Sequence, residues 1–336
     1  MLASLFQKGE GVEKNITKAA HWLRAAAVQG DKVALSELMG LHLKELNVGR
    51  EFSELIKNYE KSLKAEDVDS QFLLGQLYHE GRDVIQDFSL AAELYRQAAE
   101  RGNKDAQYGL ATLYKNGHGL PINIQKAMFW LERAASGGHL IAISTLAAAY
   151  DNGVDVNQND EAASYWYEQG ALAGDVEAQF LTGNRYETGT GFTRNFVKAM
   201  RFYELAAENG HTEAKFRLAQ FFEHGIGTDE NHQKAGKLYL QAANSDYGPA
   251  QAAIGRLYFS GKGVKRDMLQ AQKYLKVSSE KGDAVSQYLL AEILSSGIGV
   301  STDKVQSTHF YKQSAEQAYA PAQYKLGQIY AFGAGC

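Results

Sequence analysis

Small and apolar residues recur along the chain at helical spacing, inside a longer period of 36 residues. In the clearest copy Ser70, Leu74, Gly75 and Leu77 precede Gly81, and this spacing predicts a first helix, helix A. The residue that opens helix A is small in almost every copy, which permits close contact between helices. Position 75 holds glycine or alanine in nearly all copies. Because an interior glycine costs a helix about 1 kcal/mol relative to alanine, we expect a neighbouring backbone to approach very closely there.

The second half of each unit predicts another helix, helix B. After an N-cap residue come an alanine, an aromatic pair such as Trp166-Tyr167, and an Ala-Ala pair, and the helix ends at a closing glycine suited to a left-handed conformation. The cap side chain can accept a hydrogen bond from an otherwise unpaired amide of the first turn. The expected caps are Asn15, Asp87, Asn123, Asn159, Asn195, Asn231, Asp267 and Asp303.

Glycines mark the loop between helix A and helix B. The first of them fall on a 36-residue grid at Gly9, Gly81, Gly117, Gly153, Gly189, Gly225, Gly261, Gly297 and Gly333. A second glycine follows two residues later in most copies. Asn47, Asp83 and Asp155 replace it in the others, and these residue types also tolerate left-handed geometry. Each repeat therefore contains defined breaks between two helices.

Two helices of roughly a dozen residues, about 20 Å long each, cannot bury both of their apolar stripes alone, so the copies must stack. The sequence thus predicts an all-α fold, an α-solenoid of 36-residue helix-turn-helix repeats forming a single array over residues 1–336. The expected units are a partial repeat at 1–30, a degenerate repeat at 31–66, full repeats at 67–102, 103–138, 139–174, 175–210, 211–246, 247–282 and 283–318, and a half repeat at 319–336.

The tyrosine content supports this array. The chain has 19 tyrosines, and several of them occupy one helix-A position. Aromatic residues at helical spacing are usually part of a core, so we expect this series to fill the space between repeats. The series is Tyr78, Tyr114, Tyr150, Tyr186, Tyr258 and Tyr330.

The unit at residues 175–210 closely resembles the Sel1-like repeat in its opening alanine, its tyrosine, its Gly-x-Gly loop, its Lys-Ala and aromatic pairs, and its final Ala-Ala-x-x-Gly. Tetratricopeptide repeats share the two-helix plan but are 34 residues long and lack this loop. The resemblance covers the whole chain and is strongest from residue 67 to 335. It implies a right-handed, tetratricopeptide-like superhelix and a non-catalytic adaptor that binds a protein or peptide, as bacterial exported factors of the family do.

The composition limits the classes of partner that the chain is expected to bind. The formal charge is −4, from 35 basic and 39 acidic residues, so no overall basic field favours a nucleic acid or an anionic membrane. No apolar run is long enough to cross a membrane. The single cysteine, Cys336, excludes an intrachain disulfide and a cysteine-based zinc site. The expected partner is therefore another protein or peptide.

The sequence contains no recognisable motif for catalysis, metal binding or phosphate binding. The Gly-x-Gly sequence follows a helix rather than a strand and lacks Gly-Lys-Ser/Thr, so we do not interpret it as a phosphate loop. The histidines, among them His79, His118, His139 and His211, have no metal-ligand spacing and are interpreted as surface or capping residues. We therefore expect no enzyme, no metal and no cofactor. The alternative, prompted by the cysteine-rich members of the resembled family, is a hydrolase acting on cell-wall material or an antibiotic.

By analogy with tetratricopeptide solenoids, helix A lines the concave face, so its variable positions are the candidate protein-binding residues. One position forms an aromatic series, which either packs or grips a peptide: Phe72, Tyr108, Phe180, Phe216, Tyr288 and Tyr324. Another position forms an acidic series, which is either a solvated face or a site for a basic segment. Its members are Asp151, Glu187 and Glu223, neighboured by Asn152 and Asn184.

The ends of the chain suggest an excised fragment. Residues 1–8 resemble the last two turns of a helix A, and the chain stops within an inter-helix loop after Gly333. We expect a targeting signal to lie outside these residues, and the resemblance favours a bacterial exported protein. A monomer is expected, with end-to-end association through uncapped terminal helices as the alternative.

Overall fold

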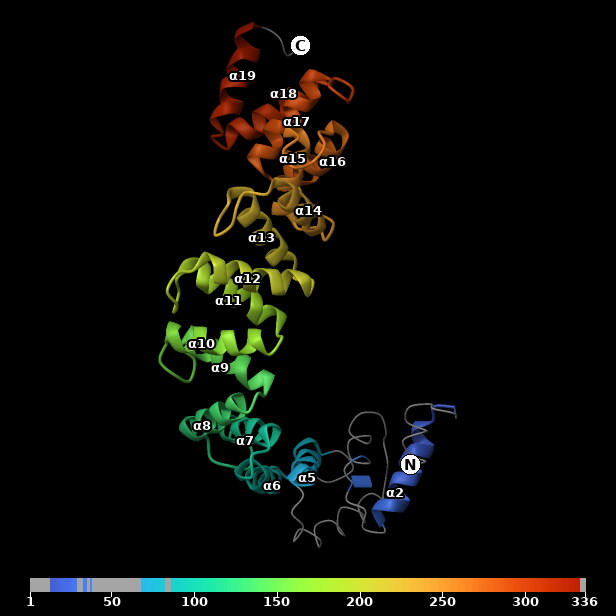
Figure 1. Ribbon diagram of the computed structural model, residues 1–336, viewed down its shortest axis with the longest axis vertical. Helices are drawn as coiled ribbons and strands as arrows, with labels where there is room; N and C mark the ends of the chain where they lie inside the picture. Colours follow the sequence, from blue (N-terminus) through green and yellow to red (C-terminus); the bar gives the residue numbers. More distant parts are fainter. Residues whose placement is uncertain (1–12, 29–32, 35–36, 38–67, 82–85, 333–336) are drawn as a thin grey trace. The chain divides into compact units, whose positions relative to one another are not determined.

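The computed structural model describes residues 13–28, 33–34, 37, 68–81 and 86–332. These residues form sixteen α-helices and no strand (Figure 1). The predicted all-α architecture of paired helices is thereby confirmed. The chain divides into two compact units, residues 1–159 and residues 160–336. The degenerate unit predicted at 31–66 lies almost entirely outside the described residues.

The described residues of the first unit include two complete helix pairs. Its described helices are α2 (Ile16–Val28), α5 (Val68–Glu80), α6 (Phe88–Glu100), α7 (Lys104–Asn116), α8 (Ile124–Ser136) and α9 (Leu140–Asn152). Helices α5 and α7 are of type A, and α6 and α8 are their type B partners, as expected for the repeats at 67–102 and 103–138. Helix α9 is the next helix A and packs against α8.

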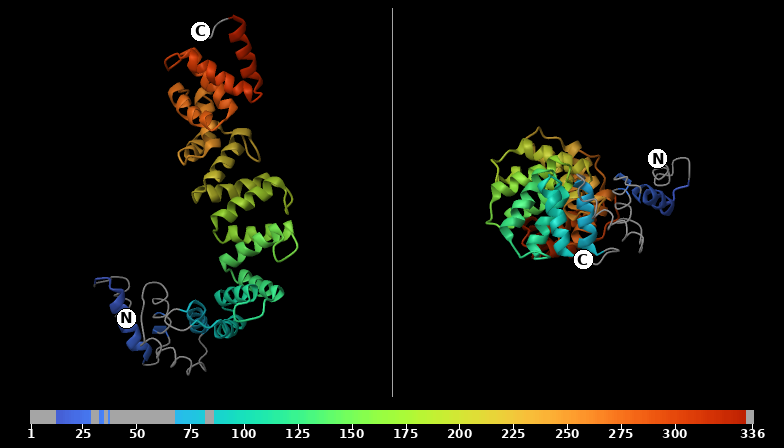
Figure 2. Two further views of the ribbon diagram at one scale, coloured as in Figure 1. Left: turned by 180° about the vertical axis from the view of Figure 1, so that it is seen from behind. Right: turned by 90° about the horizontal axis from the view of Figure 1, so that it is seen from below.

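The second unit continues the same alternation. Its helices are α10 (Asp160–Leu172), α11 (Val176–Thr188), α12 (Phe196–Glu208), α13 (Thr212–His224), α14 (His232–Ala243), α15 (Gly248–Ser260), α16 (Met268–Glu280), α17 (Ala284–Ser296), α18 (Lys304–Glu316) and α19 (Ala320–Phe332). Within this unit the pairs follow one another as packed layers (Figures 1 and 2).

Side-chain caps start the helices at the predicted places. The Oδ1 atom of Asn195 accepts a hydrogen bond from the backbone N–H of Lys198 at 3.0 Å. Six further helix-B caps accept the same bond, and they are Asn15, Asp87, Asn123, Asn231, Asp267 and Asp303. Two histidines cap helices of type A. The Nδ1 atoms of His139 and His211 each accept a backbone N–H at 3.1 Å, so these are capping histidines, as the sequence predicts.

The second glycine of the inter-helix loop touches the preceding repeat. Gly191 has a φ of +67°, and a Cβ atom there would clash with the carbonyl oxygen of Asp160 at the start of α10. Gly263 lies in the same way against His232. The loop of one repeat thus packs on the first turn of the previous helix B, which explains why this position needs glycine.

At two interior glycines of helix A, Gly75 and Gly183, the nearest neighbour is a side chain rather than the expected backbone. A Cβ atom at Gly75 would lie 2.7 Å from Cδ1 of Tyr95, and one at Gly183 would lie 2.7 Å from Cδ1 of Tyr203. The predicted close approach is confirmed, but the neighbour is the ring of a helix-B tyrosine. The glycine removes a methyl group so that a large aromatic ring can lie against the helix.

The prediction that one helix-A tyrosine series fills the core is only partly correct. Tyr186 is buried, whereas Tyr330 is 69% exposed. The other members are half-buried. The tyrosines whose exposure is 2% or less come from helix B, and they are Tyr95, Tyr203, Tyr239 and Tyr311.

Replacing Gly191 with alanine should destabilise the chain more than replacing Gly210. Both glycines have positive φ, which costs an L-residue about 1 kcal/mol. Only Gly191 faces a backbone, whereas a Cβ atom at Gly210 would meet nothing within 4 Å. Urea unfolding of G191A and G210A should therefore show an additional loss of about 1–3 kcal/mol for G191A. Equal losses would show that the loop does not depend on this contact.

Candidate protein-binding site

The aromatic series predicted on helix A is largely packed. Phe180 is 9% exposed, and its ring centroid lies 5.8 Å from that of Tyr203 and 4.4 Å from that of His211. The ring of Tyr108 stacks on His139 at 4.5 Å in the same way. Phe72, Phe216 and Tyr288 are half-buried against helix-B tyrosines at 5.8, 5.6 and 5.8 Å. Tyr324 alone of this series is largely exposed, at 67%. A role in gripping a peptide stays a prediction.

Two members of the acidic series, Glu187 and Glu223, bind buried phenols. The Tyr203 hydroxyl donates to Oε2 of Glu187 at 2.5 Å, and the Tyr239 hydroxyl donates to Oε2 of Glu223 at 2.6 Å. Burial, and then these hydrogen bonds, raise the pKa of both tyrosines well above the ordinary value. The carboxylates therefore have a structural role as acceptors for buried hydroxyls. Asn184 is half-buried on α11 near the same tyrosine.

The structure divides the acidic series between the two units. Asp151 and Asn152 lie at the end of α9 in the first unit, whereas Glu187 and Glu223 belong to α11 and α13 in the second. Each part is therefore a separate candidate surface. Binding of a basic segment stays a prediction for both.

The repeat at 67–102 shows how a helix-B tyrosine is enclosed. The ring of Tyr95 stacks on Phe72 and lies against Gly75, both on α5. On the other side it meets the next helix A, where a Cβ atom at Gly109 would lie 2.8 Å from its Cε2 atom. Its hydroxyl is 3.3 Å from Nδ1 of His79. These four positions define what we call the tyrosine site of a repeat.

The following repeat has a pocket at its tyrosine site. Leu131 stands where Tyr95 stands one repeat earlier, and the facing residues of α9 are the small Ser144 and Thr145. A pocket of about 560 Å³ opens between α7, α8 and α9, with Tyr108 and Ala148 among its lining residues. The volume is within the range of sites that bind large side chains or small ligands.

An ion pair borders the pocket. The Nζ atom of Lys115 is 2.6 Å from Oδ2 of Asp155, and both residues line the pocket. Asp155 stands in the second glycine series of the loops and keeps the left-handed φ of +68°. A non-glycine residue in this conformation costs about 1 kcal/mol, and such strain is concentrated at functional sites.

A second repeat with leucine at the tyrosine site offers a comparison. Leu275 is fully buried in a cluster with Leu290 and Ile293. The residues equivalent to Ser144 and Thr145 are there the large Tyr288 and Leu289, and Leu289 packs against this cluster. The loss of a tyrosine is therefore compensated in the repeat at 247–282. Around Leu131, small residues on the facing helix leave the space open.

Two of the predicted binding residues, Tyr108 and Asn152, line this pocket, whereas Lys115, Leu131 and Asp155 were not predicted. A signal for them was present, because Ser144 interrupts the aromatic series and Asp155 interrupts the second glycine series. Three departures from the repeat pattern, at Leu131, Ser144 and Asp155, come together at one place. Such coincident departures are expected at functional sites rather than in regular scaffold.

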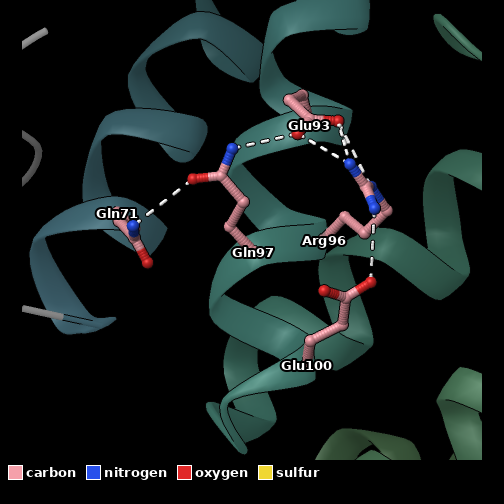
Figure 3. Close-up of polar contacts among 5 residues, drawn as sticks. All are labelled: Gln71, Glu93, Arg96, Gln97 and Glu100. Carbon is pink, nitrogen blue, oxygen red and sulfur yellow. Dashed lines mark hydrogen bonds and ion pairs between the residues drawn. The ribbon is translucent and has the colours of Figure 1, made fainter. Parts of the chain in front are cut away.

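The polar network on α6 is a surface feature (Figure 3). Arg96 pairs with Glu93 at 2.7 Å and with Glu100 at 3.3 Å, and Gln97 joins Glu93 to Gln71 of α5. These hydrogen bonds lower the pKa of Glu93. The ion-paired side chains are about half exposed, and exposed pairs of this kind contribute little to stability.

Other kinds of site have no support in the described part of the chain. Among those residues, no group of three or more histidine, cysteine, aspartate or glutamate side chains could hold a metal ion. None of the described helices is both long and apolar enough to cross a membrane.

The architecture of repeated helix pairs defines an α-helical repeat protein. The family model described as "Sel1 repeat" matches residues 1–31, 68–103, 104–139, 142–175, 176–211, 212–247, 248–283, 284–319 and 320–336. The chain therefore belongs to the Sel1 repeat family, as its resemblance indicates. Members of this family are generally scaffolds for protein–protein interaction.

Two solved structures are similar over nearly the whole chain. One is a protective antigen present in uropathogenic Escherichia coli strains that displays an SLR fold. It is 27% identical, with a TM-score of 0.66 over 99% of this chain and 79% of its own. The other is a Sel1 repeat protein from Oxalobacter formigenes, also 27% identical, with a TM-score of 0.57 over 97% of this chain and 93% of its own. No protein with a curated description matches the chain.

The cap of α9 should make stability depend on pH. Burial, opposed by Asp105 and supported by Lys104, lowers the pKa of His139 below the ordinary 6.5. Protonation of Nδ1 would also remove the acceptor of the Ala142 N–H. The stabilising contribution is therefore complete above about pH 6.5 and is lost as the pH falls below that value.

The matched variant is H139N, because asparagine can cap the helix without titrating. Urea midpoints measured from about pH 8 to about pH 5 should fall more steeply for the wild type than for H139N. Parallel curves would contradict the assigned role of this histidine.

Proposed function

We propose that this chain is a non-catalytic scaffold that binds a segment of another protein on its helix-A surface, at the pocket between α7, α8 and α9. The family assignment supports protein binding in general. The pocket supports the location, because three departures from the repeat pattern, at Leu131, Ser144 and Asp155, meet there. This coincidence is the observation that carries the proposal.

The chemistry of the pocket suits a polypeptide. Its lining includes the buried Leu131 and Ala149, which would contact an apolar side chain, and the polar Thr112, Thr145 and Asn152. These polar side chains donate hydrogen bonds back to carbonyls of their own helices, so their oxygen atoms can still accept N–H groups of a bound peptide. An apolar anchor surrounded by polar groups is the usual composition of a protein interface.

A second surface belongs to the proposal. The half-buried carboxylates of Glu187 and Glu223 are fixed by tyrosine hydroxyls, so they are oriented before any partner binds. Each still has lone pairs that can accept a lysine or arginine. We include a basic segment as the partner of this surface in the second unit.

The two similar bacterial structures, one of them described as a protective antigen, support a bacterial exported or host-interaction setting for this scaffold. No observation on the described residues favours the hydrolase alternative, so it is not proposed.

An arginine at Ala148 should block the pocket. Ala148 lines the pocket, and its equivalent in the repeat at 247–282 is Arg256, so helix A accepts this residue. Peptides are first selected on the wild-type chain from a randomised display library. We expect A148R to lower its affinity for these peptides by about ten-fold or more, or about 1.4 kcal/mol. Fluorescence polarisation with the labelled peptides measures this change.

The matched control is Q220R, because Gln220 occupies the same repeat position outside the pocket. Its affinity for the peptides should stay within about two-fold of the wild type. A selection that yields no peptide, or peptides that A148R and Q220R affect equally, would contradict the proposed location.

Removing the charges of Glu187 and Glu223 should weaken a basic ligand without unfolding the chain. Glutamine still offers an oxygen to the tyrosine hydroxyls, so the thermal midpoint of E187Q/E223Q should stay close to that of the wild type. Affinity for a lysine-rich peptide should fall about five-fold and become less sensitive to salt. The control is E161Q/E280Q, which changes two exposed glutamates of the same unit. Equal losses for the two double variants would show that only net charge matters.

A further inference from the structure

The chain itself shows what a tyrosine site accepts. Helix B places a tyrosine at this position in five of the described repeats, Tyr167 among them, and the hydroxyls of the other four hydrogen-bond to helix A as follows. Tyr95 lies 3.3 Å from His79 Nδ1, and Tyr203, Tyr239 and Tyr311 donate to Glu187, Glu223 and Glu292 at 2.5, 2.6 and 2.6 Å. The tyrosine site therefore combines an apolar slot for a planar ring with a polar group for its hydroxyl.

The pocket between α7, α8 and α9 is lined by the equivalents of the residues around Tyr95. Tyr108 stands at the position of Phe72, Ala111 at that of Gly75, and Thr145 at that of Gly109. Lys115 stands where His79 meets the Tyr95 hydroxyl. The walls of a tyrosine site are thus present, but Leu131 is too short to reach as far as a tyrosine ring.

We propose that this pocket receives a tyrosine side chain presented by a partner polypeptide, which completes the repeat from outside as Tyr95 completes its own repeat from within. This inference rests on the proposed function and names the anchor that the scaffold recognises. The ring would stack on Tyr108 and pack on Ala111, Leu131 and Thr145, and its hydroxyl would meet Lys115.

The charges at the pocket select for this anchor. Lys115 and Asp155 form a pair at 2.6 Å, so the rim adds little net charge. A lysine or glutamate anchor would lose water on entry and find no uncompensated opposite charge. The Lys115 ammonium has three N–H donors and uses one for Asp155, so another can serve a phenol oxygen. An uncharged ring with one polar atom therefore fits the site better than a charged or purely aliphatic group.

The source of the ring is a polypeptide rather than a free small molecule. The pocket is continuous with side chains of helix A that can accept backbone N–H groups, at Thr112 and Asn152 on its rim. If a free phenol occupied the pocket, these oxygen atoms could accept hydrogen bonds only from water. A bound peptide would instead supply backbone N–H donors on both sides of the ring.

The test uses the full chain and amide nuclear magnetic resonance with N-acetyl-tyrosinamide as the probe. We expect saturable shifts confined to amides of α7, α8 and α9. N-acetyl-leucinamide should bind about five-fold more weakly, because it lacks the ring contact with Tyr108. N-acetyl-lysinamide should not saturate. A synthetic Gly/Ser-rich peptide with one central tyrosine should bind more tightly than N-acetyl-tyrosinamide, and its alanine counterpart should not bind.

The decisive variant is L131Y, which supplies the ring from the chain's own helix. Tyr239 stands in a repeat with an alanine, Ala219, at the position of Ala111, so the ring should fit beside Ala111. L131Y should lose binding of the tyrosine probe and the tyrosine peptide, and L269Y, the same change at an exposed leucine, should keep both. S144F, which enlarges the facing wall, is the second blocking variant should L131Y fail to fold.

The outcomes separate this inference from the proposed function. Equal binding of the leucine and tyrosine probes, unchanged shifts in L131Y and S144F, or binding of the probe but not of the tyrosine peptide would each overturn the tyrosine anchor. If A148R lowers the affinity for library peptides but these peptides need no aromatic residue, the tyrosine anchor would be overturned and the proposed scaffold function would be retained. If the library yields no binding peptide and the tyrosine probes do not bind, both the tyrosine anchor and the proposed scaffold function would be overturned.

Discussion

The packing of one helix-B aromatic ring between two successive A helices is the interaction on which this structure depends. In the repeat at 67–102 the ring of Tyr95 lies against Gly75 on one side and Gly109 on the other, at distances that leave no room for a methyl group. Tyr95 is 2% exposed. It therefore joins this helix pair to the next helix A, and it explains why a small residue is needed inside the helix at a cost in helix propensity. Helix caps and loop glycines then set where each helix begins and ends.

The same constraint explains how a regular array obtains a local site. A repeat that gives up its ring must either refill the space or leave a pocket. Leu275 is surrounded by large neighbours and the space is refilled, whereas Leu131 faces Ser144 and Thr145 and a pocket remains. The scaffold needs no new element for this change. Because each repeat contacts mainly its neighbours, one repeat can be specialised without destabilising distant ones.

Much of the fold follows from periodicity, because each helix start and stop is encoded by a residue type with a local mechanism. Asn195 caps α12 and Gly189 ends α11 with positive φ, as the pattern indicates. The candidate surface was predicted less well. Tyr108 and Asn152 line the pocket, but Phe180 is mainly a packing residue, and Glu187 holds the hydroxyl of Tyr203. Sequence spacing places these side chains on one helix face but cannot show which of them another helix covers.

The sequence by itself determined the helix pairs, the repeat length, the helix caps and the family. These features depend on residues close together in the chain and on a period that recurs without gaps. Only the tertiary structure decided which tyrosines are core, which carboxylates serve them and where a pocket opens. Those outcomes depend on contacts between residues of different helices and loops, such as Tyr203 with Glu187 or Lys115 with Asp155, whose combined volumes and charges no single segment contains.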